Sequence, residues 1–468
     1  MSPEPRRLHR AGILVYALAT LREAAIPLLA VFVVGGLGGG FDERALLRGA
    51  GFAVAGTVFA SVAGYVRWRT TTWWVTGEGI HRRSGVVSIK ETDVPLGRIQ
   101  SLDVEQGPLQ RLFGVHSLHV QTGGGGAKGE IVLEALDLEQ VRELRALVAA
   151  GRPAEVADAP EPDAERRLSR PALLVAALTA GQLGVLLPVL AAAGQLSQSL
   201  FDERRGEEAI GLLPDAAGEW VLAGAVLLAL AWVLSTLGSV VAFAGFTVSR
   251  EGERLRIRRG LLAHREATVP VGRVRAVEVV EGVLRWPLGL AALRMEVIGH
   301  ADEPTAARML FPLIARRDVR AFLDELLPEL ADDLDGLEPL PRRAHARYVL
   351  PPVAVAAVAG ALLWALTGAG AWALALAVPA AAAYGTLAFR AAGWRLEGGR
   401  LVTRALRLAR VTLLAPAAHR ESHTLSQTPL QRRGDLADVR VAFGKQTSAS
   451  VRHLDTGTAA RLWEEIAT

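Results

Sequence analysis

Arginine is the residue type whose spacing in this sequence best suits the binding of a charged ligand. Arg254, Arg256 and Arg258 alternate with Leu255 and Ile257. Side chains two positions apart on a β-strand point to the same face, so this pattern predicts a strand with one basic and one apolar face. Beside the inner surface of a membrane, such a face lies in the field of anionic lipids, worth about 1 kcal/mol for each charge. The alternative is that these arginines are solvated and only set the orientation of the chain in a membrane.

Other chemistry has little support in the sequence. There is no cysteine, which excludes disulfides, thiolate nucleophiles and thiolate metal sites. His116 and His119 are three positions apart on an expected strand and therefore face opposite ways, while His419 lacks the neighbouring glutamate of a zinc-protease helix. The glycine run 123–126 lacks the Gly-Lys-Ser/Thr ending of a phosphate-binding loop. We therefore expect no catalytic residue, no metal and no cofactor.

A motif rich in glutamine and arginine recurs along the chain. The stretch VPLGRIQSLDVEQGPLQRLFG at Val94–Gly114 returns without a gap as VPVGRVRAVEVVEGVLRWPLG at Val269–Gly289. A weaker third copy begins at Pro416. A repeat of this length indicates one structural module that has been multiplied.

The polar residues of this motif have two interpretations. In the first, Gly107 and Pro108 form a turn, and the polar residues around them have only a structural role. Alternatively, Gln106, Gln110 and Arg111 present polar groups at a recognition edge. Together with the basic strand, the motif supplies the candidate contact residues for a lipid or a partner: Arg98, Gln106, Gln110, Arg111, Arg254, Arg256, Arg258, Arg273, Arg275, Gln427, Gln431 and Arg432.

The composition and the apolar runs predict a membrane protein. Of 468 residues, 51% are hydrophobic and 21% are charged, a mixture that fits spans alternating with soluble parts. The apolar runs come in three pairs: Ala24–Gly39 with Gly49–Val66, Pro171–Gly194 with Trp220–Phe243, and Tyr348–Thr367 with Ala371–Phe389. Most of them reach the roughly 20 residues that cross a bilayer as a helix. Their central portions hold no ionisable residue, which disfavours an ion or substrate path.

The distribution of arginine predicts the orientation. The short loops within each pair carry few basic residues, whereas the long segments between pairs carry arginines at the membrane edge, among them Arg67, Arg69, Arg166, Arg167, Arg342 and Arg343. Positive charge is retained on the cytoplasmic side. We therefore expect both termini and the three long segments to be cytoplasmic, in a multi-pass protein of the inner membrane.

Each long segment reads as short strands followed by a helix. Leu102 and Val104 alternate with polar residues, which is typical of a strand with one buried face. The run Asp137–Ala149 places apolar residues on one stripe of a helix, and Arg317–Leu330 and Thr456–Ile466 look alike. This pattern predicts a mixed membrane protein with six transmembrane helices in three hairpins, each hairpin followed by a small bent β-sheet or barrel plugged by a C-terminal helix.

The motif GRIQSLDVEQGPLQRLFG, its place after a pair of membrane helices and the tandem layout resemble bacterial pleckstrin-homology (PH) membrane proteins of the YdbT type. The resemblance covers nearly the whole chain and implies PH-like folds, with no known reaction, and an involvement in envelope or stress responses. The expected boundaries are a lead-in and hairpin at 1–66, a PH-like domain at 67–150, a linker at 151–170, a hairpin at 171–244, a PH-like domain at 245–330, a linker at 331–347, a hairpin at 348–392 and a PH-like domain at 393–468.

These observations favour a non-catalytic membrane scaffold. Its expected partners are another membrane protein or a second copy of itself, together with anionic lipids of the inner leaflet. Nucleic acid is not an expected partner, because no recognised motif interleaves the charges. The alternative from a different class is a component of a membrane transporter or enzyme, with an unrecognised site between the spans.

Overall fold

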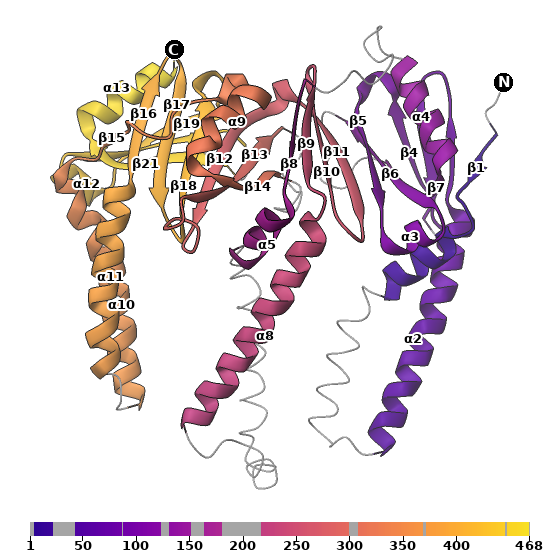
Figure 1. Ribbon diagram of the computed structural model, residues 1–468, viewed down its shortest axis with the longest axis horizontal. Helices are drawn as coiled ribbons and strands as arrows, with labels where there is room; N and C mark the ends of the chain where they lie inside the picture. Colours follow the sequence, from indigo (N-terminus) through magenta and orange to yellow (C-terminus); the bar gives the residue numbers. More distant parts are fainter. Residues whose placement is uncertain are drawn as a thin grey trace. The chain divides into compact units, whose positions relative to one another are not determined.

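The computed structural model describes residues 4–21, 43–86, 88–122, 131–150, 163–179, 217–298, 308–367, 371–444 and 447–467. The chain divides into two compact units. The first comprises residues 1–160, 180–246 and 257–268, and the second comprises residues 161–179, 247–256 and 269–468. In both units, long helices extend from β-sheets (Figure 1).

Seven strands followed by a helix recur three times, and we call the copies modules 1, 2 and 3. Module 1 consists of β1 (Arg6–Arg7), β2 (Thr72–Val75), β3 (Gly79–Ser84), β4 (Lys90–Pro95), β5 (Ile99–Gln106), β6 (Val115–Thr122), β7 (Ile131–Asp137) and α4 (Leu138–Ala150). Module 2 consists of β8 (Ala164–Arg167), β9 (Thr247–Glu251), β10 (Arg254–Arg259), β11 (His264–Pro270), β12 (Val274–Gly282), β13 (Leu290–Val297), β14 (Met309–Ala315) and α9 (Val319–Leu326). Module 3 consists of β15 (Glu338–Pro339), β16 (Gly393–Glu397), β17 (Arg400–Leu406), β18 (Ala409–Pro416), β19 (Ser422–Ser426), β20 (Leu436–Ala442), β21 (Ser448–Asp455) and α13 (Thr456–Ala467).

The sheets join strands of neighbouring modules. The first unit holds a sheet in the order β1-β2-β3-β4 and, in another sheet, the order β7-β6-β5-β11, in which β5 of module 1 pairs with β11 of module 2. The second unit holds a seven-stranded sheet in the order β14-β13-β12-β18-β17-β16-β15, in which β12 of module 2 pairs with β18 of module 3 (Figure 1). A three-stranded sheet, β19-β20-β21, completes module 3.

The expectation that each module closes its own barrel is wrong. In the part of the chain that the structure describes, no ladder joins β4 to β5 of module 1 or β18 to β19 of module 3. Both strands of such a corner keep an edge of backbone groups that still need partners. The backbone groups at the edges of β5 and β12 pair with a strand of the next module. Two modules therefore share a sheet where each was expected to close a barrel.

The C-terminal helix of each module packs as its apolar stripe predicts. In α4, Val141, Leu144 and Val148 are buried in the core of module 1, while Leu138 at the start of the helix is exposed. In α13, Leu462 is buried in the core of module 3. α4 and α13 therefore cover one side of their sheets, which keeps the apolar faces from water.

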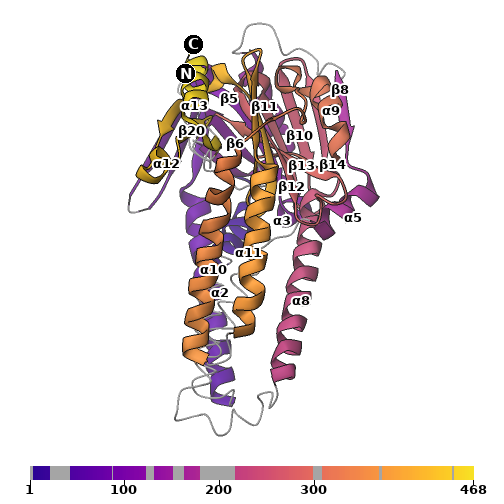
Figure 2. The ribbon, with the colours of Figure 1, turned by 90° about the vertical axis from the view of Figure 1, so that its left-hand side faces the viewer.

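Both long helices of the third hairpin lie within the described residues. α10 (His345–Thr367) and α11 (Ala371–Ala391) lie side by side (Figure 2). A Cβ atom at Gly385 would lie 2.6 Å from the carbonyl oxygen of Tyr348, and one at Gly360 would lie 2.5 Å from Cδ2 of Leu374. The glycines thus permit a close helix approach, as expected for small residues in a membrane hairpin.

Fewer spanning helices are visible than the six expected. Among the described residues, two helices are long and apolar enough to cross a membrane, Arg342–Ala365 and Leu374–Ala391, and little of either is buried. The expected span Ala24–Gly39 and most of Pro171–Gly194 lie outside the described residues. The expected spans Gly49–Val66 and Trp220–Phe243 fall within the long helices α2 (Glu43–Thr70) and α8 (Ala217–Phe243).

Candidate anion-binding site and the repeated motif

The first glutamine of the repeated motif closes a corner of the fold. Gln106 Nε2 donates to the carbonyl oxygen of Val115 at 3.3 Å in module 1. Its counterpart Gln427 donates in the same way to the carbonyl oxygen of Leu436 at 2.8 Å in module 3. Both side chains are half-buried and bond to the start of the strand that follows. The repetition of this contact shows a common structural role.

The second glutamine of the motif caps a short helix. In α3 (Pro108–Leu112), Gln110 accepts a hydrogen bond from Gly107 N at 2.6 Å and lies buried. In α12 (Pro429–Arg433), Gln431 accepts from Thr428 N at 2.8 Å. Each glutamine thus satisfies a backbone donor at the start of its helix, and in α12 the Thr428 hydroxyl also accepts from Gln431 N at 3.3 Å. The geometry therefore supports the turn-forming interpretation of these glutamines over an exposed recognition edge.

The arginines of the motif remain at the surface. Arg98 ends a 3₁₀ turn and is exposed, as is Arg432 in α12. Arg111 in α3 is exposed and reaches the carbonyl oxygen of Leu261 at 3.4 Å. These three arginines lie in three separate elements.

The basic strand has the face that its alternation predicts. Leu255 and Ile257 are buried in β10. Arg254, Arg256 and Arg258, which alternate with them, lie on the opposite face of the strand. Arg256 forms an ion pair with Glu251 at 2.9 Å, and Arg258 lies 3.9 Å from Glu266. Acidic neighbours thus offset part of the positive charge that the sequence suggested.

Arg273 ends the 3₁₀ turn between β11 and β12, and Arg275 lies at the start of β12. Arg273 is half-buried, and this burial lowers the pKa of its guanidinium group below the ordinary value. Arg275, also half-buried, is close enough to His419 to help hold the pKa of that imidazole below its ordinary value, although burial is the larger cause. Arg275 therefore belongs to the junction of modules 2 and 3.

Module 2 replaces both motif glutamines with charged residues. Glu281 stands at the position of Gln106 and is buried, accepting a hydrogen bond from Arg410 Nε at 2.6 Å. Arg285 stands at the position of Gln110 and donates to the carbonyl oxygen of Ala176 at 2.9 Å and to Thr179 Oγ1 at 2.9 Å. Burial lowers the pKa of Arg285 to about 10. The replacement therefore ties α5 (Arg170–Thr179) to module 2.

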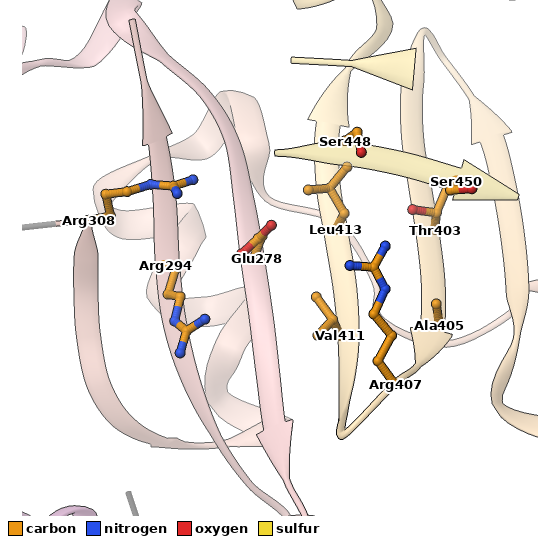
Figure 3. A pocket seen from close by; sticks show the side chains of 10 residues that line it. All are labelled: Glu278, Arg294, Arg308, Thr403, Ala405, Arg407, Val411, Leu413, Ser448 and Ser450. Atoms are coloured by element: carbon orange, nitrogen blue, oxygen red, sulfur yellow. The ribbon is translucent and has the colours of Figure 1, made fainter. Parts of the chain in front are cut away.

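A cavity of about 310 Å³ lies where modules 2 and 3 share their sheet. Its charged wall consists of Glu278 on β12, Arg294 on β13, Arg308 just before β14 and Arg407 at the end of the β17–β18 hairpin (Figure 3). Its other lining residues are Thr403, Ala405, Val411, Leu413, Ser448 and Ser450. Figure 3 shows side chains from both modules along this hollow.

Positive charge exceeds negative charge in this cavity. Glu278 lies opposite Arg294 across the β12–β13 ladder. Within the described residues, neither Arg294 nor Arg407 forms an ion pair, and the Nε of Arg294 is buried without a hydrogen-bond partner. Burial, reinforced by Arg294, lowers the pKa of Arg308, whereas Glu278 acts in the opposite direction. Guanidinium and hydroxyl donors around one cavity suit a phosphate or carboxylate group.

Arg308 already forms hydrogen bonds with residues that do not line the cavity. It donates to Glu296 and to Thr447 Oγ1, the latter at 2.6 Å. Thr447 in turn donates to Glu296 at 2.8 Å. This network fixes Arg308 in the wall, while Arg294 and Arg407 supply the uncompensated charge.

Sequence reasoning missed this cavity. Its arginines lie on strands that are far apart in the chain, and no spacing rule connects Arg294 with Arg407. The only available signal was the arginine-rich run RALRLAR at Arg404–Arg410, whose meaning depends on the pairing of β18 with β12.

Shared β-sheets, capping helices and an apolar helical hairpin define a class of membrane protein built from tandem β modules. The chain belongs to the bacterial PH domain family, which matches residues 17–152, 175–330 and 348–468. It is 24% identical over 490 residues to the UPF0699 transmembrane protein YdbT of Bacillus subtilis (strain 168), covering 99% of this chain and 97% of the relative. No solved structure matches. The relative and the two candidate spans indicate a membrane protein.

Proposed function

We propose that this protein is a non-catalytic scaffold of the inner membrane that binds anionic phosphate-bearing headgroups in the cavity between modules 2 and 3. In this proposal, six helices in three hairpins cross the membrane, and the termini and all three modules are cytoplasmic. The observation that carries it is the cavity wall, in which Arg294 and Arg407 form no ion pair among the described residues and Arg308 is held in place by Glu296.

The cavity lies close to a membrane helix. Tyr384 of α11 donates a hydrogen bond to the carbonyl oxygen of Arg407 at 3.0 Å. Leu408, the next residue at the hairpin tip, is 72% exposed. An exposed leucine beside an arginine whose carbonyl oxygen bonds to a membrane helix suits the bilayer interface, with the apolar group among acyl chains and the cation at the headgroups.

A second hairpin tip supports the same placement of the modules. Leu261 and Leu262, between β10 and β11, are both exposed. The backbone N–H of Leu261 donates to the carbonyl oxygen of Val241 in α8 at 2.9 Å. Apolar tips bonded to apolar helices in two modules favour sheets that stand directly on the membrane. The basic face of β10 is a further candidate for headgroup contact.

Lipid binding to the full chain tests the proposal. The native protein and the double variant Arg294→Gln/Arg407→Gln are reconstituted in nanodiscs of neutral lipid, titrated with phosphatidylglycerol and measured by native mass spectrometry. The matched control is Arg433→Gln/Arg440→Gln, which removes two exposed arginines of module 3 outside the cavity. We expect at least tenfold weaker binding in the cavity variant alone.

Competition by glycerol 1-phosphate distinguishes the source of the anionic group. Displacement of the lipid by this soluble phosphate assigns recognition to the headgroup, and binding of the soluble compound alone would identify a free phosphate ester as the ligand. Equal lipid binding by the native chain and the cavity variant would overturn the proposal.

A further inference from the structure

The two junctions between modules use the same strand pairing. At the first junction, β5 runs antiparallel to β11 with Gln106 opposite His264. At the second junction, β12 runs antiparallel to β18 with Glu281 opposite Arg410. In the repeat, Gln106 corresponds to Glu281 and His264 to Arg410. The fifth strand of one module and the fourth strand of the next therefore meet in one register, twice in the same chain.

Each junction also carries an ion pair across the ladder. Arg265 lies 2.7 Å from Glu105 at the first junction. Arg410 Nε donates to Glu281 at 2.6 Å at the second. Opposite charges on directly paired positions stabilise a ladder and select its register. The same strand pairing, with a cross-strand ion pair, therefore recurs at both junctions.

This pattern leaves one fourth strand and one fifth strand with a neighbour on one edge only. Within the described residues, β4, the fourth strand of module 1, pairs with β3 alone. In the same part of the structure, β19, the fifth strand of module 3, pairs with β20 alone. An edge strand presents a row of backbone donors and acceptors that another strand can complete. One free edge belongs to a fourth strand and the other to a fifth strand, and these are the strands that pair at each internal junction.

The charges of β4 do not prevent such pairing. Charged residues on an edge commonly protect it from association. Lys90 and Glu91 of β4 correspond, however, to Arg265 and Glu266 of β11, which is fully paired with β5 at these positions. The same pattern of charge therefore occurs on a strand that already accepts a fifth-strand partner.

We propose that β19 of one copy pairs with β4 of a second copy of this chain, extending the module series head to tail. Transfer of the internal register places Ser426 opposite Lys90 and His423 opposite Asp93. The occupant is a second copy because the chain itself contains both halves of the contact. The inference goes beyond the anion-binding function and does not depend on it. A head-to-tail contact of this kind builds a closed ring when its rotation closes and a filament otherwise.

Cysteine crosslinking of the full chain in membranes tests the register, since the native chain contains no cysteine. Chains carrying Lys90→Cys and chains carrying Ser426→Cys, with different tags, are co-expressed and oxidised. We expect a covalent dimer that contains both tags. The matched positive control is Glu105→Cys/Arg265→Cys, the corresponding pair at the first internal junction. The register control replaces Ser426→Cys with Leu425→Cys, whose side chain points to the other face of the strand.

Three outcomes decide the proposal. A mixed-tag dimer that forms at least tenfold faster with Ser426→Cys than with Leu425→Cys supports it. A mass of the native chain in nanodiscs that corresponds to two or more copies also supports it. The absence of this dimer, while the Glu105→Cys/Arg265→Cys control crosslinks, overturns it. Crosslinking of the double variant Lys90→Cys/Ser426→Cys within a single chain, without mixed-tag dimers, also overturns it.

Discussion

Glu281 of β12 accepts two hydrogen bonds from the guanidinium group of Arg410 in β18, one of them at 2.6 Å from Nε. The two residues belong to different modules, and the carboxylate side chain is fully buried. Arg316 approaches the same carboxylate at 3.5 Å. One acidic side chain in module 2 therefore holds a strand of module 3 in register, and two arginines share its single negative charge.

Replacement of Glu281 should destabilise the second unit strongly. Glu281→Gln removes the charge that Arg410 and Arg316 share, and breaking a buried ion pair costs about 3–5 kcal/mol. The measurement is chemical unfolding of the purified full chain in detergent. The control Glu397→Gln removes a carboxylate that is 82% exposed and lies 3.9 Å from Arg395, where we expect a change below about 1 kcal/mol. Equal effects of both variants would contradict the structural role of Glu281.

Acid should weaken module 3 through His453. Burial lowers the pKa of this imidazole, and Arg452 and Arg347 act in the same direction, while Asp438 opposes them. Its Nδ1 accepts a hydrogen bond from Gln431 at 2.9 Å, which requires that nitrogen to be unprotonated. Because the unfolded chain binds the proton more readily, stability is full above the ordinary pKa of 6.5 and falls as the pH drops through it toward the folded-state pKa.

The pH dependence has a direct test in His453→Asn. His453 has a φ of +58°, a left-handed conformation that asparagine tolerates. The variant should show a flatter dependence of the melting temperature on pH between about 7 and 5, the range around the ordinary histidine pKa. His264→Asn, at an exposed histidine, should leave the native slope unchanged. Parallel curves for the native chain and His453→Asn would exclude His453 as the source.

Enlarging Gly385 should separate the third hairpin. A Cβ atom there would lie 2.6 Å from the carbonyl oxygen of Tyr348, which is backbone and cannot move aside. We expect Gly385→Leu to cost about 1–3 kcal/mol, as overpacking does, and to lower the melting temperature in detergent. The control is Gly51→Ala in α2, where no described atom outside the helix's own backbone lies within 4 Å of the added Cβ and helix propensity favours alanine. Unchanged melting of Gly385→Leu would contradict this packing.

Module 2 should not fold as a separate fragment. Residues 245–330 would lose the ladders that β11 forms with β5 and β12 forms with β18, together with β8 of residues 164–167. We expect the fragment to aggregate or to exchange its amide hydrogens without protection, since both exposed edges lack partners. Circular dichroism and hydrogen exchange measure this. A monomeric fragment with cooperative unfolding would show that the module closes independently.

Local signals account for the elements that were predicted correctly. The alternation of arginines with Leu255 and Ile257 identified a two-faced strand, and the stripe of α4 identified the buried face of a helix. These patterns are short in range, because the side-chain period of a strand or a helix is set by its own backbone. The recurrence of the motif likewise revealed three modules without any knowledge of their packing.

The sequence by itself determined the family, the repeated modules, the apolar runs and the absence of cysteine chemistry, since each is a property of neighbouring residues. Only the tertiary structure decided that Glu281 meets Arg410 and that Arg294 and Arg407 share a cavity. These relationships depend on which strand edges pair. Edge pairing joins residues more than a hundred positions apart, and the period of a strand specifies its faces but not its neighbour.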